Sequence, residues 1–351
     1  MRALTFAKAL CEATAVCMQR DASVFVMGLG VPDPKGTFGT TLGLKEQFGD
    51  ERVFDIPTSE NGMTGIAIGA AITGQRVIMT HQRVDFALLT IEQLVNQAAK
   101  WHYMFGGQAS VPIVVRMIIG RGWGQGPQHS QSLQALFAHI PGLKVVMPAT
   151  PSDAKGLLIA SVEDNNPVMF LEHRWLHSLE DHVPEGYYSV PLGHARKVRE
   201  GKDVTIVASS WMTVEALKAH DSLQSQGISA EVIDLRTIRP LDYPTIFESV
   251  RKTGRLVVAD TGTQAFGVSA EICASVAEHE FSSLKAPPVR IALPDYPTPT
   301  SHALSQYYYP GHAEIVNACA STLGKAPIVP TGPQLPSTKL DVPHSLFKGP
   351  F

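Results

Sequence analysis

Short apolar runs of strand length alternate with longer helix-like stretches along most of this chain. The runs that resemble strands buried on both faces are 22–30, 76–81, 110–119, 143–149 and 166–173. The stretches with a helical pattern are 63–74, 90–105, 130–140 and 151–164, and residues 1–21 resemble an amphipathic helix. Alternation of this kind predicts a parallel sheet with helices on both faces, which is an α/β fold.

The alternation stops over residues 174–202, a polar segment with proline and glycine, and then resumes. Strands are predicted over 203–210, 229–235, 255–262 and 288–294, and helices over 213–226, 243–253 and 268–281. We therefore predict two doubly wound domains, the second smaller than the first. The predicted boundaries are 1–185 for the first domain, 186–202 for a linker, 203–324 for the second domain and 325–351 for an extended proline-rich tail.

Charge is scarce in this 351-residue chain, in which 17% of residues are charged and 44% are hydrophobic. Globular domains average about 25% charged residues, so we expect a large core or a surface that is buried against another chain. The net charge of −3 offers no basic patch for nucleic acid. No apolar run approaches the ~20 residues of a membrane span, so we expect no membrane insertion.

The four cysteines, Cys11, Cys17, Cys273 and Cys319, are scattered and form no C-x-x-C pair. Free cysteines are commonly small buried hydrophobes, so we expect neither disulfides nor a zinc site. The first residues carry acid and apolar periodicity, unlike a signal peptide. A cytoplasmic location is expected, or the mitochondrial matrix if a leader has been removed.

Residues 54–74 carry the strongest local signal, because a strand, a turn and a glycine-rich helix follow one another there. Glu60 stands where the helix is predicted to begin. Each helical glycine, such as Gly65 and Gly69, costs about 1 kcal/mol relative to alanine. Close packing against another helix or a flat ligand would explain that cost. Glu60 is then either a ligand-binding carboxylate or an acid that stabilises the helix N-terminus through the helix dipole.

A second candidate site is the glycine-rich segment 121–132, which contains His129. Such a loop lets backbone approach a ligand, and histidine exchanges protons near neutral pH. His129 is therefore either an acid–base residue or an ordinary surface histidine at the start of a helix from Ser130. A serine hydrolase is not indicated, because the chain has no G-x-S-x-G elbow.

Nucleotide-binding motifs are missing from the expected places. A nicotinamide dehydrogenase needs G-x-G-x-x-G directly after its first strand, but Pro32 and Pro34 disrupt that segment here. The chain also lacks a P-loop. The phosphate groups of any cofactor are therefore expected to be held elsewhere.

Seven segments in order resemble the beta subunit of the thiamine-diphosphate-dependent first component of 2-oxo acid dehydrogenase complexes, the pyruvate, branched-chain and acetoin group. These segments are 43–74, 91–108, 111–116, 127–132, 141–158, 163–172 and 233–242. The resemblance covers about residues 2–323. It implies a transketolase-like fold, with a pyrimidine-binding first domain and a smaller C-terminal domain.

The resemblance also implies roles for single residues. Glu60 matches the glutamate that hydrogen-bonds the aminopyrimidine of thiamine diphosphate, and Phe86 matches the aromatic residue that packs on that ring. Thr58 and Gln82 fall at cofactor-binding positions, and His129 matches a substrate-channel histidine linked to acyl transfer. The implied potassium-binding positions, mostly through backbone carbonyls, are Ile113, Ser161, Val162, Asp164 and Asn166.

In that family the alpha subunit holds the diphosphate and its magnesium through a Gly-Asp-Gly motif, which this chain lacks. The resemblance therefore implies an active site between subunits, in an assembly of two alpha and two beta chains. It also implies a lipoyl-bearing transacylase core as a further partner. The implied activity is decarboxylation of a 2-oxo acid and transfer of the acyl unit to a lipoyl group.

The chain departs from the family pattern at residues 81–83 (His-Gln-Arg), at Trp123 and at Pro127. Arg83 would favour an anionic substrate or partner group, or would pair with Asp85. Two alternative functions therefore stay open. One is a transketolase- or synthase-like carbon–carbon transfer to a non-lipoyl acceptor, and the other is a catalytically silent scaffold subunit.

Overall fold

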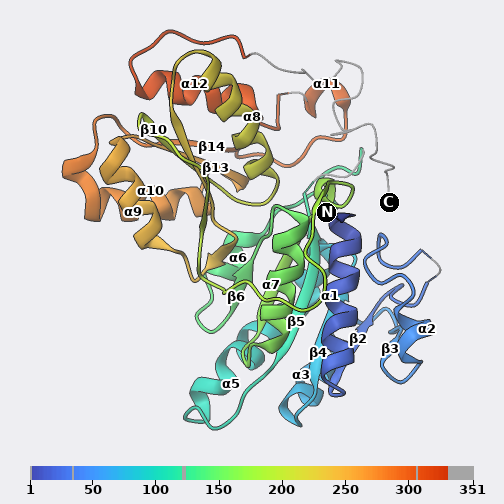
Figure 1. Ribbon diagram of the computed structural model, residues 1–351. Helices are drawn as coiled ribbons and strands as arrows, with labels where there is room; N and C mark the ends of the chain where they lie inside the picture. The colour runs from blue at the N-terminus through green and yellow to red at the C-terminus, as the bar shows by residue number, and fades with distance from the viewer. Residues whose placement is uncertain (1, 34, 121–123, 306, 331–351) are drawn as a thin grey trace.

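The computed structural model describes residues 2–33, 35–120, 124–305 and 307–330. Figure 1 shows two α/β halves, an N-terminal half in blue to green and a C-terminal half in yellow to red. The N-terminal sheet contains, in spatial order, β12 (Thr237–Arg239), β6 (Lys144–Val146), β7 (Val168–His173), β5 (Ile113–Ile119), β4 (Arg76–His81), β2 (Val24–Gly28) and β3 (Val53–Phe54). All of its strands are parallel except β12, so the predicted parallel sheet is confirmed.

Helices cover both faces of this sheet. One face carries α1 (Phe6–Arg20) and α7 (Pro151–Glu163), and the other carries α3 (Glu60–Ile72), α4 (Val84–Ala87), the 3-10 turn η1 (Leu88–Thr90), the π-helical η2 (Gln93–Ala98) and α5 (Ala99–Met104). Alternate residues of one strand pack on opposite faces. Val26 belongs to the apolar cluster under α1, and its neighbour Met27 belongs to the cluster under α3. This arrangement explains why the strands are continuously apolar.

Local signals predicted some helix boundaries well. The Thr150 hydroxyl accepts a hydrogen bond from the Asp153 amide at 3.1 Å, and α7 begins directly after it. Helix α3 begins at Glu60, as predicted. The helix predicted over 130–140 is much shorter, because α6 covers only Gln134–Ala138. Smaller elements of this half are α2 (Leu44–Phe48), η3 (Arg174–Leu176) and the antiparallel pair β1 (Ala3–Thr5) and β8 (Glu180–His182).

The C-terminal half is also a sheet with helices on both faces, and its sheet is smaller. Its sheet has the order β14 (Val289–Leu293), β13 (Leu256–Thr263), β10 (Val204–Ala208), β11 (Ala230–Asp234) and β9 (Arg196–Arg199). The covering helices are α8 (Trp211–Ser225) and α12 (His312–Thr322) on one face and α9 (Tyr243–Thr253) and α10 (Val268–Glu280) on the other, with η4 (Phe281–Ser283) and α11 (His302–Ser305) beyond them. The two doubly wound units are therefore confirmed.

The two halves are joined more closely than a simple linker predicts. Residues 196–199 of the predicted linker form β9, which pairs antiparallel with β11. Strand β12, from the C-terminal half of the sequence, adds to the edge of the N-terminal sheet beside β6. One apolar cluster contains residues of both sheets, including Met79 and Val207. The exact domain boundaries stay a prediction, and residues 331–351 of the predicted tail lie outside the described residues.

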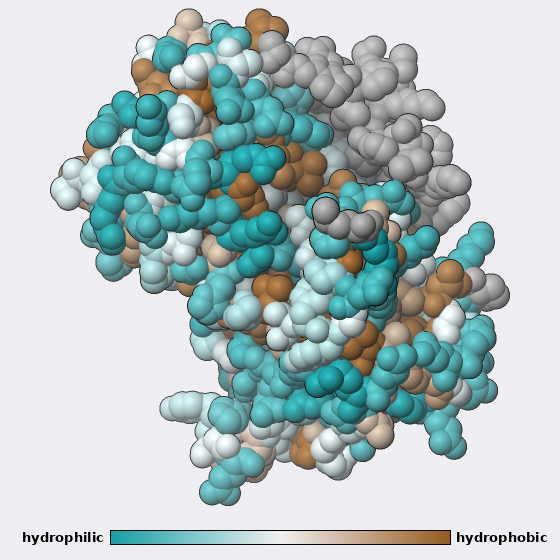
Figure 2. Space-filling view, viewed as in Figure 1, coloured by the Kyte–Doolittle hydropathy of each residue, from teal (hydrophilic) through white to brown (hydrophobic). Residues whose placement is uncertain are grey.

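Apolar and polar residues are mixed on the surface. Figure 2 shows brown, apolar residues among the teal ones of this face, several of them where the two halves meet. All four cysteines are free. Within the described ranges, no helix combines the length and the apolarity that crossing a membrane requires.

Candidate active site

The carboxyl ends of β3, β2, β4 and β5 meet at one edge of the N-terminal sheet, because these strands run parallel. The loops that follow them contact one another. The Gly30 amide donates to the Asp55 carboxylate at 3.1 Å, and the Gln82 side chain donates to the Leu29 carbonyl at 3.3 Å. The segments that carry Glu60, Phe86 and His129 all leave the sheet at this edge.

Glu60 is buried, with a relative exposure of 6%, at the first residue of α3. The Thr64 hydroxyl donates to the Glu60 carbonyl at 2.7 Å and contacts the Met79 sulfur at 3.3 Å, which ties the first helical turn to β4. Among the described residues, the Glu60 carboxylate has no hydrogen-bond or ion-pair partner. The helix dipole stabilises a carboxylate there. The carboxylate oxygens are not fully enclosed, so a ligand can reach them from the edge of the sheet.

Thr58 and Gln82 are exposed, on the loops that follow β3 and β4. Thr58 lies in the turn that leads into α3, where the Ser59 amide donates to the Pro57 carbonyl at 2.7 Å. The structure therefore brings both predicted cofactor-binding positions to the same edge as Glu60. Their side chains are accessible to a ligand or a second chain.

Phe86 and His129 are in contact, with ring centroids 5.5 Å apart and planes inclined at 77°. His129 lies in a turn, and its amide donates to the Gly126 carbonyl at 3.4 Å. The prediction of a helix directly after His129 is wrong, because α6 begins only at Gln134. The Gly120 amide donates to the Gln131 carbonyl at 3.0 Å, a longer-range bond that closes the described part of this segment, residues 124–131, against the end of β5.

Arg83 is buried, with a relative exposure of 4%, directly after β4. Its guanidinium donates to the Gly120 carbonyl at 3.2 Å and to the Gln125 side chain. One of the two alternatives for Arg83, an ion pair in contact with Asp85, is not formed within the described residues. The Asp85 carboxylate accepts from the Gln131 side chain at 2.7 Å, although the Arg83 charge still lowers its pKa against the effect of burial. Burial lowers the pKa of Arg83 and raises the pKa of Asp85. Gln125 and Gln131 were not identified as candidates from the sequence, although both lie in the glycine-rich segment.

The neighbouring departure, His81, is also buried, and burial lowers its pKa to about 4. Its imidazole is therefore neutral at pH 7. Pro127 is exposed beside His129, and Trp123 lies outside the described residues.

The positions expected to bind potassium are Ile113, Ser161, Val162, Asp164 and Asn166. They lie at the opposite, amino-terminal edge of the sheet, where α7 ends and β5 and β7 begin. The Arg76 guanidinium donates to the carbonyls of Val162 and Asp164 at 2.8 and 3.1 Å, and Lys144 pairs with the Asp164 carboxylate. Two of the expected ligands, the Val162 and Asp164 carbonyls, therefore already accept hydrogen bonds from the Arg76 guanidinium. Each carbonyl oxygen has a second lone pair that could still bind an ion.

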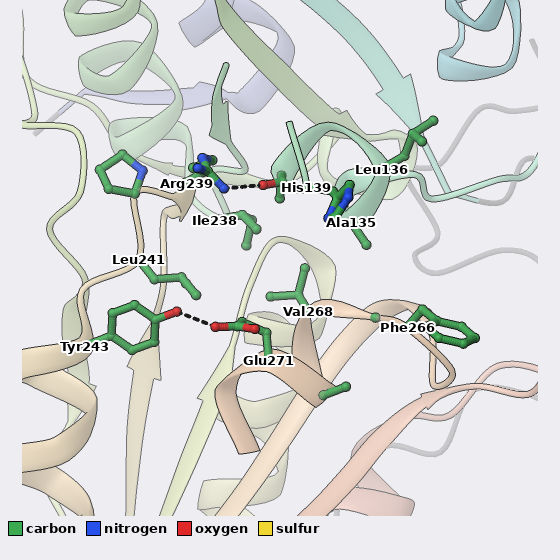
Figure 3. Close-up of a pocket in the computed structure, with 14 residues that line it drawn as sticks. Ala135, Leu136, His139, Ile238, Arg239, Leu241, Tyr243, Phe266, Val268 and Glu271 are labelled. Atoms are coloured by element: carbon green, nitrogen blue, oxygen red, sulfur yellow. Dashed lines mark hydrogen bonds between the residues drawn. The ribbon is translucent and has the colours of Figure 1, made fainter. Parts of the chain in front are cut away.

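A hollow of about 1070 Å³ lies between the two halves, away from the sheet edge that carries Glu60, Phe86 and His129. Figure 3 shows Leu136 of α6 and the following His139 on one side and Val268 and Glu271 of α10 on the other. The Tyr243 hydroxyl donates to Glu271 at 2.8 Å at the margin. None of the catalytic or cofactor-binding candidates lines this hollow, so its size does not identify it as the site of chemistry.

Comparisons with known proteins place this geometry in a family. Residues 2–178 match the transketolase pyrimidine-binding domain, and residues 193–315 match the transketolase C-terminal domain. The chain is 45% identical over 332 residues to the beta subunit of acetoin:2,6-dichlorophenolindophenol oxidoreductase from Cupriavidus necator, covering 92% of this chain and 98% of that one. It is 46% identical over 319 residues to the mitochondrial pyruvate dehydrogenase E1 component subunit beta-1 of Arabidopsis thaliana, covering 90% and 88%.

The chain belongs to the beta-subunit family of the 2-oxo acid dehydrogenase first component. A solved structure described as a split-gene transketolase, an inactive beta4 tetramer, matches the fold with a TM-score of 0.75. It covers 92% of this chain and 98% of its own, at 22% identity. This beta-subunit family is thiamine-diphosphate-dependent, so the chain is a subunit of a thiamine-diphosphate-dependent enzyme. The unpartnered Glu60 carboxylate and the aromatic ring of Phe86, whose segments leave the sheet at the same edge, fit the aminopyrimidine of that cofactor.

Proposed function

We propose that this beta subunit supplies the pyrimidine-binding side of an active site that decarboxylates a 2-oxo acid and transfers the acyl unit to a lipoyl group. The observation that carries the proposal is Glu60, a residue only 6% exposed whose carboxylate has no partner in the described chain and remains within reach of a ligand. Phe86 and His129 leave the sheet at the same edge. A carboxylate, an aromatic ring and an imidazole together can bind a heterocycle and move protons beside it.

Thiamine diphosphate, when bound, supplies a carbon nucleophile and an electron sink for decarboxylation. Glu60 would hold a proton between its carboxylate and the pyrimidine ring nitrogen, and Phe86 would pack on the ring. Thr58 and Gln82 would contact the cofactor from the adjoining loops. His129 would give or take a proton at its imidazole while the acyl unit leaves, since an imidazole is suited to that role near neutral pH.

An alpha subunit would complete this site by holding the diphosphate and magnesium, for which this chain has no Gly-Asp-Gly motif. The glycine face of α3 supports such a partner. A methyl group built on Gly69 would meet no atom of the described chain within 4 Å. Apolar side chains nearby in this layer of helices are also exposed, including Ile66 and Leu89. We propose an assembly of two alpha and two beta chains, with a lipoyl transacylase as a further partner.

Potassium is a separate part of the proposal. The ion would bind at the amino-terminal edge of the sheet, and its role would be structural. The residues that would hold it, mostly through backbone carbonyls, are Ile113, Ser161, Val162, Asp164 and Asn166. Replacing sodium by potassium at equal ionic strength is expected to raise the melting temperature of the assembled enzyme. Equal melting temperatures in the two salts would remove potassium from the proposal.

The decisive variant is Glu60→Gln in the enzyme reconstituted with its alpha partner. It is expected to abolish decarboxylation of 2-oxo acids and leave assembly intact, because glutamine keeps the size and loses the titrating carboxylate. Glu51→Gln, an exposed carboxylate, is the matched control. Near-normal turnover of the Glu60 variant would contradict the proposed role of Glu60 in decarboxylation. Acylation of a lipoyl domain, compared with transfer to free aldehydes, separates the proposed reaction from a synthase-like one.

A further inference from the structure

The turn after β4 contacts the segment that carries His129 at several points. Arg83 donates to the Gly120 carbonyl at the start of that segment and to the Gln125 side chain within it. Asp85 accepts from the Gln131 side chain near its end. The rings of Phe86 and His129 then touch between these contacts. One short turn therefore holds the described parts of this segment on both sides of the histidine.

The chemistry of the Arg83 side chain suits it to holding this segment in place. Its guanidinium is buried, and within the described chain its hydrogen bonds go to two neutral oxygens, while the Asp85 carboxylate interacts with it through charge alone. Bonds from a charged donor are stronger than neutral ones, and low polarity strengthens them further. The planar fork of arginine reaches two acceptors at once, which the single ammonium of lysine does in a less fixed geometry.

His129 itself has few other attachments. Among the described residues its imidazole has no hydrogen-bond partner, and it has an edge-on ring contact with Phe86. The amide of His129 makes a long bond of 3.4 Å to the Gly126 carbonyl. Gly126 directly follows Gln125, the residue that Arg83 holds. The position of the imidazole therefore depends on where the segment is held.

We propose that Arg83 is a positioning residue, which fixes the His129 segment against Phe86 so that the imidazole is placed for acyl transfer. This inference rests on the proposed function for its kinetic consequence, but its structural part does not. Arg83→Met is expected to slow acyl transfer to the lipoyl group about tenfold or more, because small displacements of an acid–base group are costly. The KM for the 2-oxo acid and the affinity for thiamine diphosphate are expected to stay near wild type.

The test uses the reconstituted enzyme and the variants Arg83→Met, Gln125→Ala, the double variant and Arg83→Lys. The control is Arg52→Met, which removes another guanidinium that donates to backbone carbonyls, those of Val24, Met18 and Asp21, at the opposite end of β2. Hydrogen exchange followed by mass spectrometry reports on residues 124–131. Acyl transfer to a lipoyl domain and decarboxylation with an electron-accepting dye are measured separately.

We expect exchange in 124–131 to rise about tenfold or more in Arg83→Met, since hydrogen bonds to a charged group are lost. Gln125→Ala is expected to give a smaller rise, and the double variant less than the sum of the two effects, because both act through one contact. Arg83→Lys is expected to restore part of the transfer rate. If Arg83→Met does not fold, Gln125→Ala alone must still raise exchange and slow transfer.

Other results overturn the proposal. Unchanged exchange in Arg83→Met, or changes equal to those of Arg52→Met, would show that Arg83 does not hold this segment. A raised KM for the 2-oxo acid with unchanged exchange would mean that Arg83 contacts the substrate directly. A wild-type enzyme that decarboxylates no 2-oxo acid would instead refute the proposed function, and the exchange measurement would still decide the role of Arg83.

Discussion

The imidazole of His129 lies edge-on to the phenyl ring of Phe86, with 5.5 Å between the ring centroids. Phe86 comes from α4, after β4, and His129 comes from the turn after β5. Because β4 and β5 are neighbouring parallel strands, the loops at their carboxyl ends meet. One aromatic ring therefore supports the histidine and is available to pack on a cofactor.

Replacing Phe86 by leucine is expected to weaken two properties at once. The edge-on contact contributes roughly 1 kcal/mol, so acyl transfer is expected to slow several-fold. Thiamine diphosphate affinity is expected to fall as well. His129→Asn, in contrast, is expected to slow acyl transfer and leave cofactor affinity unchanged. Cofactor titration and transfer kinetics on the assembled enzyme measure both, and a Phe86→Leu variant with wild-type cofactor affinity would contradict the dual role.

Gly69→Leu is expected to block assembly with the alpha subunit without damaging the chain. The side chain would point from α3 into space that no described residue occupies. Gly69→Ala is the matched control, because it gains about 1 kcal/mol of helix stability and adds only one methyl group. Copurification and light scattering with the alpha partner check the result. Wild-type assembly of the leucine variant would show that this face is not an interface.

Breaking the buried pair of Arg116 and Glu172 is expected to be severely destabilising. The guanidinium contacts the carboxylate at 2.6 and 3.0 Å, and both side chains are about 1% exposed. Burial raises the pKa of Glu172, but the Arg116 charge outweighs it and lowers that pKa below its ordinary value. Arg116→Met removes the guanidinium from a buried carboxylate and leaves it only the His177 imidazole, 3.3 Å away. The expected cost is about 3 to 5 kcal/mol.

The double replacement Arg116→Met with Glu172→Leu is expected to cost less than Arg116→Met alone, because no charge is then left unpaired. Melting temperatures of the assembled enzymes compare the two. A double variant that melts well below the single one would argue against an electrostatic origin.

The raised pKa of Asp234 makes the free energy of unfolding depend on pH. Burial and the nearby Asp153 raise its pKa from 3.8 to about 7. The folded state therefore keeps a proton that the unfolded chain releases near pH 4, so the contribution of Asp234 to stability falls as pH rises from about 4 to about 7. The total change is up to about 4 kcal/mol. Above pH 7 the contribution is constant.

Asp234→Asn is expected to remove this part of the pH dependence. An amide oxygen still accepts from the Thr213 hydroxyl and from the Arg236 amide, both at 3.2 Å in the native chain. The difference in melting temperature between pH 5 and pH 8 is expected to shrink by several degrees. An unchanged difference would mean that Asp234 is already ionised at pH 5.

Local chemistry explains where prediction from the sequence succeeded. The starts of α3 and α7 follow from residues near them, an acid in the first turn of α3 and a threonine cap with proline for α7. The edge strands β9 and β12 were not predicted. Each is short and contains charged residues, and each is defined by backbone pairing with a strand distant in sequence. No periodic pattern reports such pairing.

The sequence by itself determined the two α/β units, the order of their elements and the family, because apolar periodicity and ordered motifs are properties of neighbouring residues. Only the tertiary structure decided which groups meet at the site. Arg83 binds Gly120 and Gln125 rather than Asp85, and His129 lies in a loop against Phe86 rather than on a helix. These contacts join separate loops at one edge of a sheet, so the register of parallel strands determines them, and that register forms only when the chain folds.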